Sequence, residues 1–360
     1  MKIAQIAPVW TAIPPVGYGG AEKIISLLTD ELVRKGHDVT LFASGDSKTK
    51  AKLVSVCDKS PGLSKEAQTS IVNNMNHIFN IFLSLEQEKD FDVMHWHVSK
   101  DLIPIMAANL SNKSSIITIH NHFYDEEMEL MKHILDYYRK FPNFISVSNF
   151  HRRYFPYEFI STVYNGINLD EFDYNENPEN YLVWIGRFES TKGVHLAIEA
   201  AIKLKIKLKL AGPKDENDYY EAKVKPYLNN EYIEYVGEVN VQERNALLRN
   251  AKLFLNPIFW DEPFGLVVPE ANACGTPVVA ARRGAMPELI EEGYNGFIVE
   301  PNNLEAIVEG IKKVYSLPPA EYLKLRYQSR KRVEEHFTYQ KMTENYEKIY
   351  QKISKRHFLW

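Results

Sequence analysis

The stretch KIAQIAPVWTAIPPVGYGGAEKIISLLTDELVRKGHDVTLFA, residues 2–43, decides the fold class. It opens with the short apolar run KIAQIA, continues with an amphipathic pattern over residues 21–36, and closes with a second apolar run, DVTLFA. Short apolar runs predict buried strands, and apolar residues that recur every three to four positions predict a helix. A strand, a helix and a strand in this order form a βαβ unit, which predicts a parallel sheet covered by helices.

The same alternation extends over most of the 360 residues, which is more than one hydrophobic core usually serves. A polar, turn-rich segment at residues 168–180 interrupts it and predicts a hinge between two α/β domains. From residue 318 onward no strand pattern remains, so the tail is predicted to be helical. The predicted strands before the hinge are FDVMHWH, SIITIH, FISVS and STVYN, and those after it are YLVWIG, KIKLKLAG, EYIEYVG, AKLFLNP, TPVVAA and GFIVE. The Lys/Leu/Ile alternation at residues 203–210 predicts an edge strand or a helix-to-strand junction.

Composition excludes several classes of function. The net charge of −4 gives no basic field for nucleic acid. Cys57 and Cys274 lack metal-ligand spacing, which indicates reduced thiols in a cytoplasmic protein. The apolar run at the amino terminus is too short for a signal peptide. No other run reaches the roughly 18 consecutive apolar residues of a membrane-spanning helix.

Two strand-to-helix loops carry residues suited to phosphate. The first, PPVGYGGAEK, contains Gly17, Gly19 and Gly20, which allow a ligand to approach the free amides of a helix start, although a simple capping turn fits equally well. The spacing departs from G-x-G-x-x-G, which argues against a nicotinamide dehydrogenase. The second loop, GRFESTKG, places Arg187 and Lys192 where they suit a diphosphate that gains charge as it leaves.

The segment DEPFGLVVPE, residues 261–270, holds two carboxylates, Glu262 and Glu270, around an apolar run. Pro269 fits a helix only in its first turn, so the helix is predicted to begin near Gly265 or Leu266. The amides at that start would favour a diphosphate, and the carboxylates would accept hydrogen bonds from hydroxyl groups. Spacing alone favours the simpler interpretation of one helix-capping acid and one acid on the helix surface.

Paired histidines, His95 with His97 and His120 with His122, lie at two predicted strand ends. Alternate strand residues face the same way, so each pair has the spacing of a metal site. No carboxylate or cysteine partner accompanies them. We therefore predict no metal ion, one or two histidines in a ligand site, and local hydrogen bonds for the others.

Nine motifs in order give the chain a strong resemblance to a known family: GYGGAE, TIH, VSNF, YNGI, GRFESTKG, AGP, DEPFGLVVPE, ACGTPVV and NGF. From residue 1 to about 300 the chain resembles the retaining glycosyltransferases of family 4, which have the GT-B fold and are related to glycogen and sucrose synthases. The resemblance implies two Rossmann-like domains that face each other across a deep cleft. It also implies that the helical segment 338–360 returns to complete the first domain, residues 1–170, while residues 171–337 form the donor domain.

The resemblance assigns roles by position. Glu262 matches the residue that contacts the hydroxyls of the donor sugar, with the backbone of Phe264, Gly265, Leu266 and Val267 beside it, and Glu270 matches the ribose ligand. Arg187 and Lys192 match the pair that stabilises the departing diphosphate. Gly20, next to Gly19, matches the glycine whose amide meets a phosphate, and His120 matches the histidine near the donor sugar. Arg283 and Asn121 depart from the usual family residues near that sugar.

The activity that the resemblance implies is metal-independent, retaining transfer of a hexosyl group from a nucleoside diphosphate sugar to a hydroxyl acceptor. A UDP-sugar is the favoured donor, with GDP-mannose and ADP-glucose left open. The acceptor is left open among a lipid-linked saccharide, a cell-surface polymer precursor and a small metabolite. The basic, aromatic end KISKRHFLW favours a solvated helix end over contact with the inner face of a membrane. Three alternatives stay open: an inverting transferase with His120 as base, a nucleotide-sugar epimerase, and a non-catalytic nucleotide-sugar-binding protein.

Overall fold

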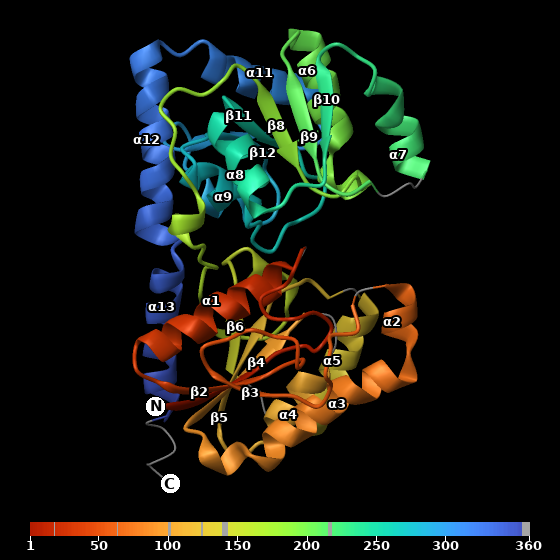
Figure 1. The fold of residues 1–360 in the computed structure, drawn as a ribbon, viewed down its shortest axis with the longest axis vertical. Helices are drawn as coiled ribbons and strands as arrows, with labels where there is room; N and C mark the ends of the chain where they lie inside the picture. The colour runs from red at the N-terminus through yellow and green to blue at the C-terminus, as the bar shows by residue number, and fades with distance from the viewer. Residues whose placement is uncertain are drawn as a thin grey trace. The chain divides into compact units, whose positions relative to one another are not determined.

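The computed structural model describes residues 1–17, 19–62, 64–99, 102–123, 125–138, 143–214 and 218–354. They form two compact units: Met1–Gly166 with the segment that begins at Tyr339, and Ile167–Thr338. Each unit contains one parallel sheet with helices packed on it (Figure 1). The predicted fold class, α/β with two parallel-sheet domains, is confirmed.

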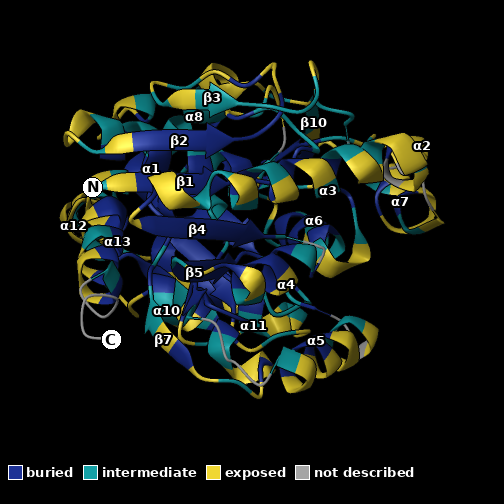
Figure 2. Cartoon of the chain, turned by 90° about the horizontal axis from the view of Figure 1, so that it is seen from below, coloured by how far each residue is buried: buried dark blue, intermediate teal, exposed yellow. Residues whose placement is uncertain are grey.

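The first unit has seven strands among its described residues, in the order β3-β2-β1-β4-β5-β6-β7. The innermost strands are almost wholly buried because helices cover both faces of the sheet, and β4 is buried along its whole length (Figure 2). The strands are β1 Lys2–Ile6, β2 Asp38–Phe42, β3 Lys52–Val54, β4 Val93–Val98, β5 Ser114–Ile119, β6 Asn143–Ser146 and β7 Phe159–Thr162.

Two strands of this sheet differ from the sequence prediction. The edge strand β3 was not predicted, because it is only three residues long and none of them is fully buried. The last strand, β7, ends at Thr162, whereas the pattern STVYN predicted a strand over residues 161–165. Both lie at the edges of the sheet, where burial, and with it the apolar signal, is weakest.

The helices of the first unit pack on this sheet over a core that includes Trp96 and Phe144. They are α1 Gly20–Arg34, α2 Lys65–Thr69, α3 Ile71–Glu86, α4 Ile103–Leu110, α5 Asp125–Tyr138 and α13 Tyr339–Ser354, with short 3₁₀ turns η1 Glu88–Asp90 and η2 His151–Tyr154. The tail helix α13 thus belongs to the same unit as the first strands of the chain.

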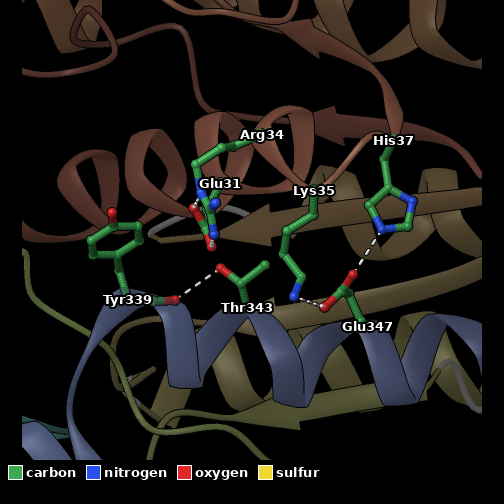
Figure 3. A network of polar contacts seen from close by, with 7 residues as sticks. All are labelled: Glu31, Arg34, Lys35, His37, Tyr339, Thr343 and Glu347. Atoms are coloured by element: carbon green, nitrogen blue, oxygen red, sulfur yellow. Dashed lines mark hydrogen bonds and ion pairs between the residues drawn. The ribbon is translucent and has the colours of Figure 1, made fainter.

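A polar contact ties α13 to the end of α1 (Figure 3). Glu347 on α13 accepts from Lys35 Nζ at 3.0 Å and pairs with His37 Nε2 at 2.8 Å. Although partial burial opposes it, these hydrogen bonds and the neighbouring charges hold the pKa of Glu347 below its ordinary value. A group with a depressed pKa stabilises the fold above its unfolded pKa, so this contact supports the position of α13 at neutral pH.

The second unit has a six-stranded sheet within its described residues, in the order β10-β9-β8-β11-β12-β13. The strands are β8 Leu182–Ile185, β9 Leu208–Ala211, β10 Ile233–Gly237, β11 Leu253–Asn256, β12 Val278–Ala281 and β13 Gly296–Val299. All six lie within the predicted apolar runs. The helices and turns are η3 Leu169–Glu171, η4 Ser190–Lys192, α6 Val194–Leu204, α7 Asp218–Lys223, η5 Lys225–Tyr227, α8 Val241–Asn250, α9 Val267–Ala273, α10 Met286–Leu289, α11 Leu304–Tyr315 and α12 Pro319–His336.

The Lys-rich alternation at residues 203–210 is a helix-to-strand junction. Helix α6 ends at Leu204, Lys205 adopts a left-handed conformation with φ of 55°, and β9 begins at Leu208. The prediction of an edge strand is wrong, since β9 lies between β8 and β10. The lysines alternate because the junction is half exposed: Lys209 stays partly accessible, with its ammonium 4.1 Å from the Tyr181 ring centroid.

A buried arginine, Arg326 on α12, joins three other chain segments of the second unit to its own helix. Its side chain has no exposed surface. The guanidinium donates to the carbonyl oxygens of Asn175, Arg249, Ala251 and Cys274 at 2.8–3.2 Å. Two of these carbonyls, those of Ala251 and Cys274, belong to the cap residues that follow α8 and α9. Arg326 therefore satisfies helix-end acceptors that water does not reach.

We expect Arg326→Leu to lower the free energy of unfolding of the second unit by about 3 kcal/mol, because several buried carbonyls lose their donor at once. Urea unfolding measures the change. The matched control is Lys331→Leu on the same helix, where the lysine is 45% exposed and the expected change is within about 0.5 kcal/mol. Equal unfolding midpoints for the two variants would contradict the role assigned to Arg326.

None of the helices in the described part of the chain is both long enough and apolar enough to cross a lipid bilayer.

Candidate functional site

In the second unit, the predicted site residues follow two adjacent strands. The chain passes from β8 to β9 on one side of the sheet, and β11 later pairs with β8 on the other side. This reversal of strand order is a topological switch point, where parallel sheets bind ligands beyond the carboxyl ends of their strands. Arg187 and Lys192 lie in the loop after β8, and Glu262 lies in the loop after β11.

Lys192 and Glu262 are in direct contact. Lys192 Nζ lies 2.8 Å from Glu262 Oε2, and the two side chains are 17% and 20% exposed. The ammonium group also lies 4.6 Å from the centroid of the Trp260 ring, which gives it a cation–π contact. The partly buried cation and carboxylate are thus held together at one point of the switch region.

The backbone around Lys192 is fixed by close packing between the two loops. Gly193 has φ of 66°, and a Cβ there would lie 1.9 Å from the carbonyl oxygen of Pro257, so only glycine fits. The Phe259 amide donates to the carbonyl of Thr191 at 2.8 Å, and Trp184 Nε1 donates to the carbonyl of Lys192 at 3.3 Å. These contacts explain why a glycine must follow Lys192 directly.

The loop that carries Glu262 is held from the other side by the turn before α10. The Ala285 amide donates to the Glu262 carbonyl at 2.9 Å, and the Gly284 amide donates to Asp261 Oδ1 at 2.9 Å. Gly284 has φ of 55°, and a Cβ there would lie 2.2 Å from the Glu262 carbonyl oxygen. Arg283, one of the residues that departs from the family pattern, lies beside this turn with Nη1 4.0 Å from Asp261 Oδ2.

Glu270 lies in the first turn of α9, which begins at Val267 with Leu266 as its N-cap. The predicted helix start is confirmed, and Pro269 occupies the first turn as expected. Glu270 is buried, and its Oε1 lies 3.3 Å from Nη2 of Arg244 on α8. Arg244 was not predicted as a site residue, because a single arginine in an exposed helical pattern carries no local signal.

Arg187 lies nearer the surface, with Nη1 2.7 Å from Oε1 of Glu189 in its own loop. The stretch from Phe264 to Val267 forms the approach to α9, and Gly265 adopts φ of 92° within it. A Cβ at Gly265 would lie 3.1 Å from Glu262 Cγ, so this backbone and the carboxylate of Glu262 pack against each other.

In the first unit, two of the predicted residues, Gly19 and Gly20, also lie at a switch point. The chain runs from β1 to β2 on one side, and β4 pairs with β1 on the other. Gly19 and Gly20 lie between β1 and α1, with Gly20 as the first helical residue. A Cβ on Gly19 would lie 2.8 Å from Pro15 Cβ, so the loop is packed too closely for another residue.

His120 directly follows β5 and is almost buried, with 8% of its surface exposed. Its Nε2 lies 3.0 Å from Nδ1 of His97, and the two rings stack with centroids 5.3 Å apart. Burial lowers the pKa of His120 to about 4, because the charged imidazolium would lose its hydration. Burial likewise places the pKa values of His95 and His97 well below the ordinary value. All three are therefore neutral at pH 7.

The four histidines of the two paired motifs are distributed over several partners. His95 and His97 bond side chains of the core, while the His122 ring packs near His151 and Tyr154. Asn121, the second departure from the family pattern, donates to the Ser99 carbonyl at 3.0 Å. Within the described ranges, no cluster of three or more His, Cys, Asp or Glu side chains has the arrangement of a metal site. The basic tail end at residues 355–360 lies outside the described residues.

Two family models match the chain in succession. The model described as Glycosyltransferase Family 4 matches residues 18–171, and the model described as Glycosyl transferases group 1 matches residues 168–332. The second match contains Arg187, Lys192, Glu262 and Glu270, and the first contains His120.

Similar proteins are found both by sequence and by structure. An uncharacterized glycosyltransferase of Methanocaldococcus jannaschii is 26% identical over 88% of this chain and 89% of its own length. Sucrose-phosphate synthase from Thermosynechococcus elongatus superposes with a TM-score of 0.76 at 19% identity, over 98% of each chain. Anabaena HepE in complex with UDP and glucose superposes with a TM-score of 0.75 at 18% identity, over 98% of this chain and all of its own.

Proposed function

The chain is a GT-B glycosyltransferase of the family 4 and group 1 type, and we propose that it transfers a hexosyl group from a UDP-sugar to a hydroxyl acceptor, with retention and without a metal ion. UDP is favoured as the leaving group because HepE, a protein of similar fold, has a crystal structure in complex with UDP and glucose. Retention, UDP specificity and metal independence are the parts of the proposal that experiment must test.

The observation that carries the proposal is the contact between Lys192 and Glu262 at the switch point of the second unit. A diphosphate needs cations, and a sugar needs hydrogen-bond acceptors for its hydroxyl groups. Lys192 and Arg187 follow one strand, and Glu262 follows its neighbour. We assign Glu262 to the sugar hydroxyls, and Lys192 and Arg187 to the diphosphate whose charge grows as it leaves.

Glu270 is assigned to the ribose hydroxyls. Its carboxylate is buried and paired with Arg244, so it is held in one position before a ligand binds. A ribose diol would donate two hydrogen bonds to the carboxylate oxygens, while Arg244 retains its place at Oε1. The backbone from Phe264 to Val267 is assigned to the donor as well. In the first unit, we assign Gly19 and Gly20 to a phosphate and His120 to the sugar.

The state of His120 favours retention over an inverting mechanism with His120 as base. Burial holds its pKa at about 4, and Nε2 already faces His97. A general base works best with a pKa near the operating pH, so His120 would accept a proton poorly at pH 7. Retaining transfer avoids that demand, because the departing phosphate can take the proton of the acceptor hydroxyl.

The proposal is tested by titrating the protein with UDP, GDP, ADP and their common sugar conjugates in the presence of EDTA, while thermal unfolding is recorded. A diphosphate at about 100 times its dissociation constant should add about 2.7 kcal/mol to the free energy of unfolding. We expect the largest stabilisation from UDP and one UDP-sugar. In Glu270→Ala, we expect the affinity for UDP to fall roughly 10- to 100-fold, since hydrogen bonds to a charged group are lost.

The matched control is Glu309→Ala, which removes an exposed glutamate of α11 and should leave the titration unchanged. Comparing each variant without nucleotide separates lost binding from lost stability. Binding of UDP with slow conversion of the sugar in the absence of acceptor would favour an epimerase, and an inverted product anomer would exclude retention. If none of the nucleotides stabilises the protein, the donor site is wrong.

A further inference from the structure

A buried chain of hydrogen bonds runs from His120 through the first unit to the tail helix α13. His120 Nε2 faces His97 Nδ1 at 3.0 Å, and His97 Nε2 faces Gln5 Oε1 at 2.7 Å. Gln5 Nε2 donates to the hydroxyl of Tyr350 at 3.1 Å, and that hydroxyl lies 2.7 Å from His95 Nδ1. The four residues beyond His120 are at most 1% exposed, so water does not compete for these bonds.

The amide of Gln5 sets the direction of the bonds at the Tyr350 end. Its nitrogen can only donate, so the Tyr350 oxygen accepts from Gln5. The single hydroxyl proton of Tyr350 is then directed to His95 Nδ1, 2.7 Å away. His95 is neutral, so its proton lies on Nε2 and points to Thr118 Oγ1 at 2.7 Å.

The same amide sets the direction at the His120 end. Gln5 Oε1 can only accept, so the proton of neutral His97 lies on Nε2. His97 Nδ1 is then an acceptor, and the proton of neutral His120 lies on Nε2, where it faces His97. This leaves the lone pair of His120 on Nδ1, and no hydrogen bond to Nδ1 is found in the described part of the chain.

We propose that Gln5, His97 and Tyr350 are positioning residues that hold the proton of His120 on Nε2, so that His120 Nδ1 accepts a hydrogen bond from a hydroxyl group of the ligand. A phosphate oxygen carries no proton to donate to such an acceptor at neutral pH. The class of group that His120 recognises is therefore a sugar or polyol hydroxyl. This inference rests on the proposed function, which places His120 at the donor sugar, and it adds residues as distant as α13 to that recognition.

The first experiment reads the tautomer directly in the full chain. Nitrogen-15 NMR of histidine-labelled protein at pH 7 distinguishes protonated from unprotonated imidazole nitrogens, and His120→Gln assigns the His120 signals by their loss. We expect the proton on Nε2 of His120 and on Nε2 of His97. A proton on Nδ1 of His120 overturns the proposal, whatever the protein binds.

The second experiment uses two tyrosines of α13 as a matched pair. Tyr350→Phe removes the hydroxyl that orients the Gln5 amide, whereas Tyr346→Phe removes a hydroxyl that lies 3.0 Å from Thr118 Oγ1 and does not contact Gln5 among the described residues. Both tyrosines are fully buried and lie beside the His95 ring. The two variants therefore lose the same group from the same helix. The Tyr350 hydroxyl bonds Gln5 directly, whereas, as far as the structure describes the chain, the Tyr346 hydroxyl reaches Gln5 only through Thr118, His95 and Tyr350.

In Tyr350→Phe, we expect His120 to populate both tautomers and the affinity for UDP-glucose to fall roughly two- to tenfold, with the affinity for UDP unchanged. In Tyr346→Phe, we expect neither change. Equal effects of the two variants, or equal losses for UDP and UDP-glucose, overturn the positioning role. If the wild type binds neither probe, the proposed function fails, while a proton on Nε2 of His120 still supports the hydrogen-bond chain.

Discussion

Replacing Lys192 by alanine is expected to lower the rate of sugar transfer by about 10²- to 10³-fold or more, while the protein folds normally. Lys192 Nζ is held between Glu262 Oε2 and the Trp260 ring, and Gly193 fixes the backbone that carries it. A cation held in place before the reaction stabilises a departing diphosphate without reorganisation. Its loss therefore raises the barrier by roughly 3 to 4 kcal/mol.

The measurement is the turnover of the UDP-sugar found by the titration, with thermal unfolding recorded for each variant. Lys203→Ala is the matched control, because Lys203 lies exposed at the other end of α6 and pairs with Glu305. The Lys203→Ala variant should turn over the UDP-sugar at the rate of the wild type. We expect the turnover rate of Arg187→Ala to fall at least as far as that of Lys192→Ala. Near-native transfer by either site variant would remove the role assigned to that residue.

Acidification is expected to unfold the first unit at a pH well above that at which most proteins lose their carboxylate contacts. His95, His97, His120 and His151 are buried there, and burial lowers the pKa of each, to about 4 for His120 and about 3 for His151. Below pH 6.5 these histidines bind protons in the unfolded chain, whereas in the folded chain they stay neutral until the pH falls further. Stability is therefore complete above that pH and is lost as the pH falls toward the folded values.

Within this window each such histidine lowers the free energy of unfolding by about 1.4 kcal/mol per pH unit of acidification. The four together therefore lower it by roughly 5 kcal/mol per pH unit. Urea unfolding at pH 7.5, 6.5, 5.5 and 4.5 measures the slope. His151→Gln should reduce it by about a quarter, whereas His133→Gln, at an exposed position of α5, should leave it unchanged. A free energy of unfolding that stays constant from pH 7.5 to 5.5 would contradict the prediction.

The strands and the helix starts could be predicted because their signals are local. Apolar runs marked the six strands of the second unit, and Pro269 marked the start of α9. The short edge strand β3 was not predicted, because it has no fully buried residue and therefore only a weak apolar signal. The alternating lysines before β9 predicted either an edge strand or a helix-to-strand junction, because alternation reports only partial exposure. The structure shows the junction.

The sequence by itself determined the α/β class and the family resemblance. It marked Arg187, Lys192, Glu262 and His120 as residues that follow strands, and Glu270 as a residue near a helix start. Only the tertiary structure decided which side chains meet. It joined Lys192 to Glu262, Glu270 to Arg244, and Gln5 to Tyr350 across 345 positions. Spacing along the chain records which face of a strand or helix is buried, but the pairing of distant side chains depends on how those faces pack.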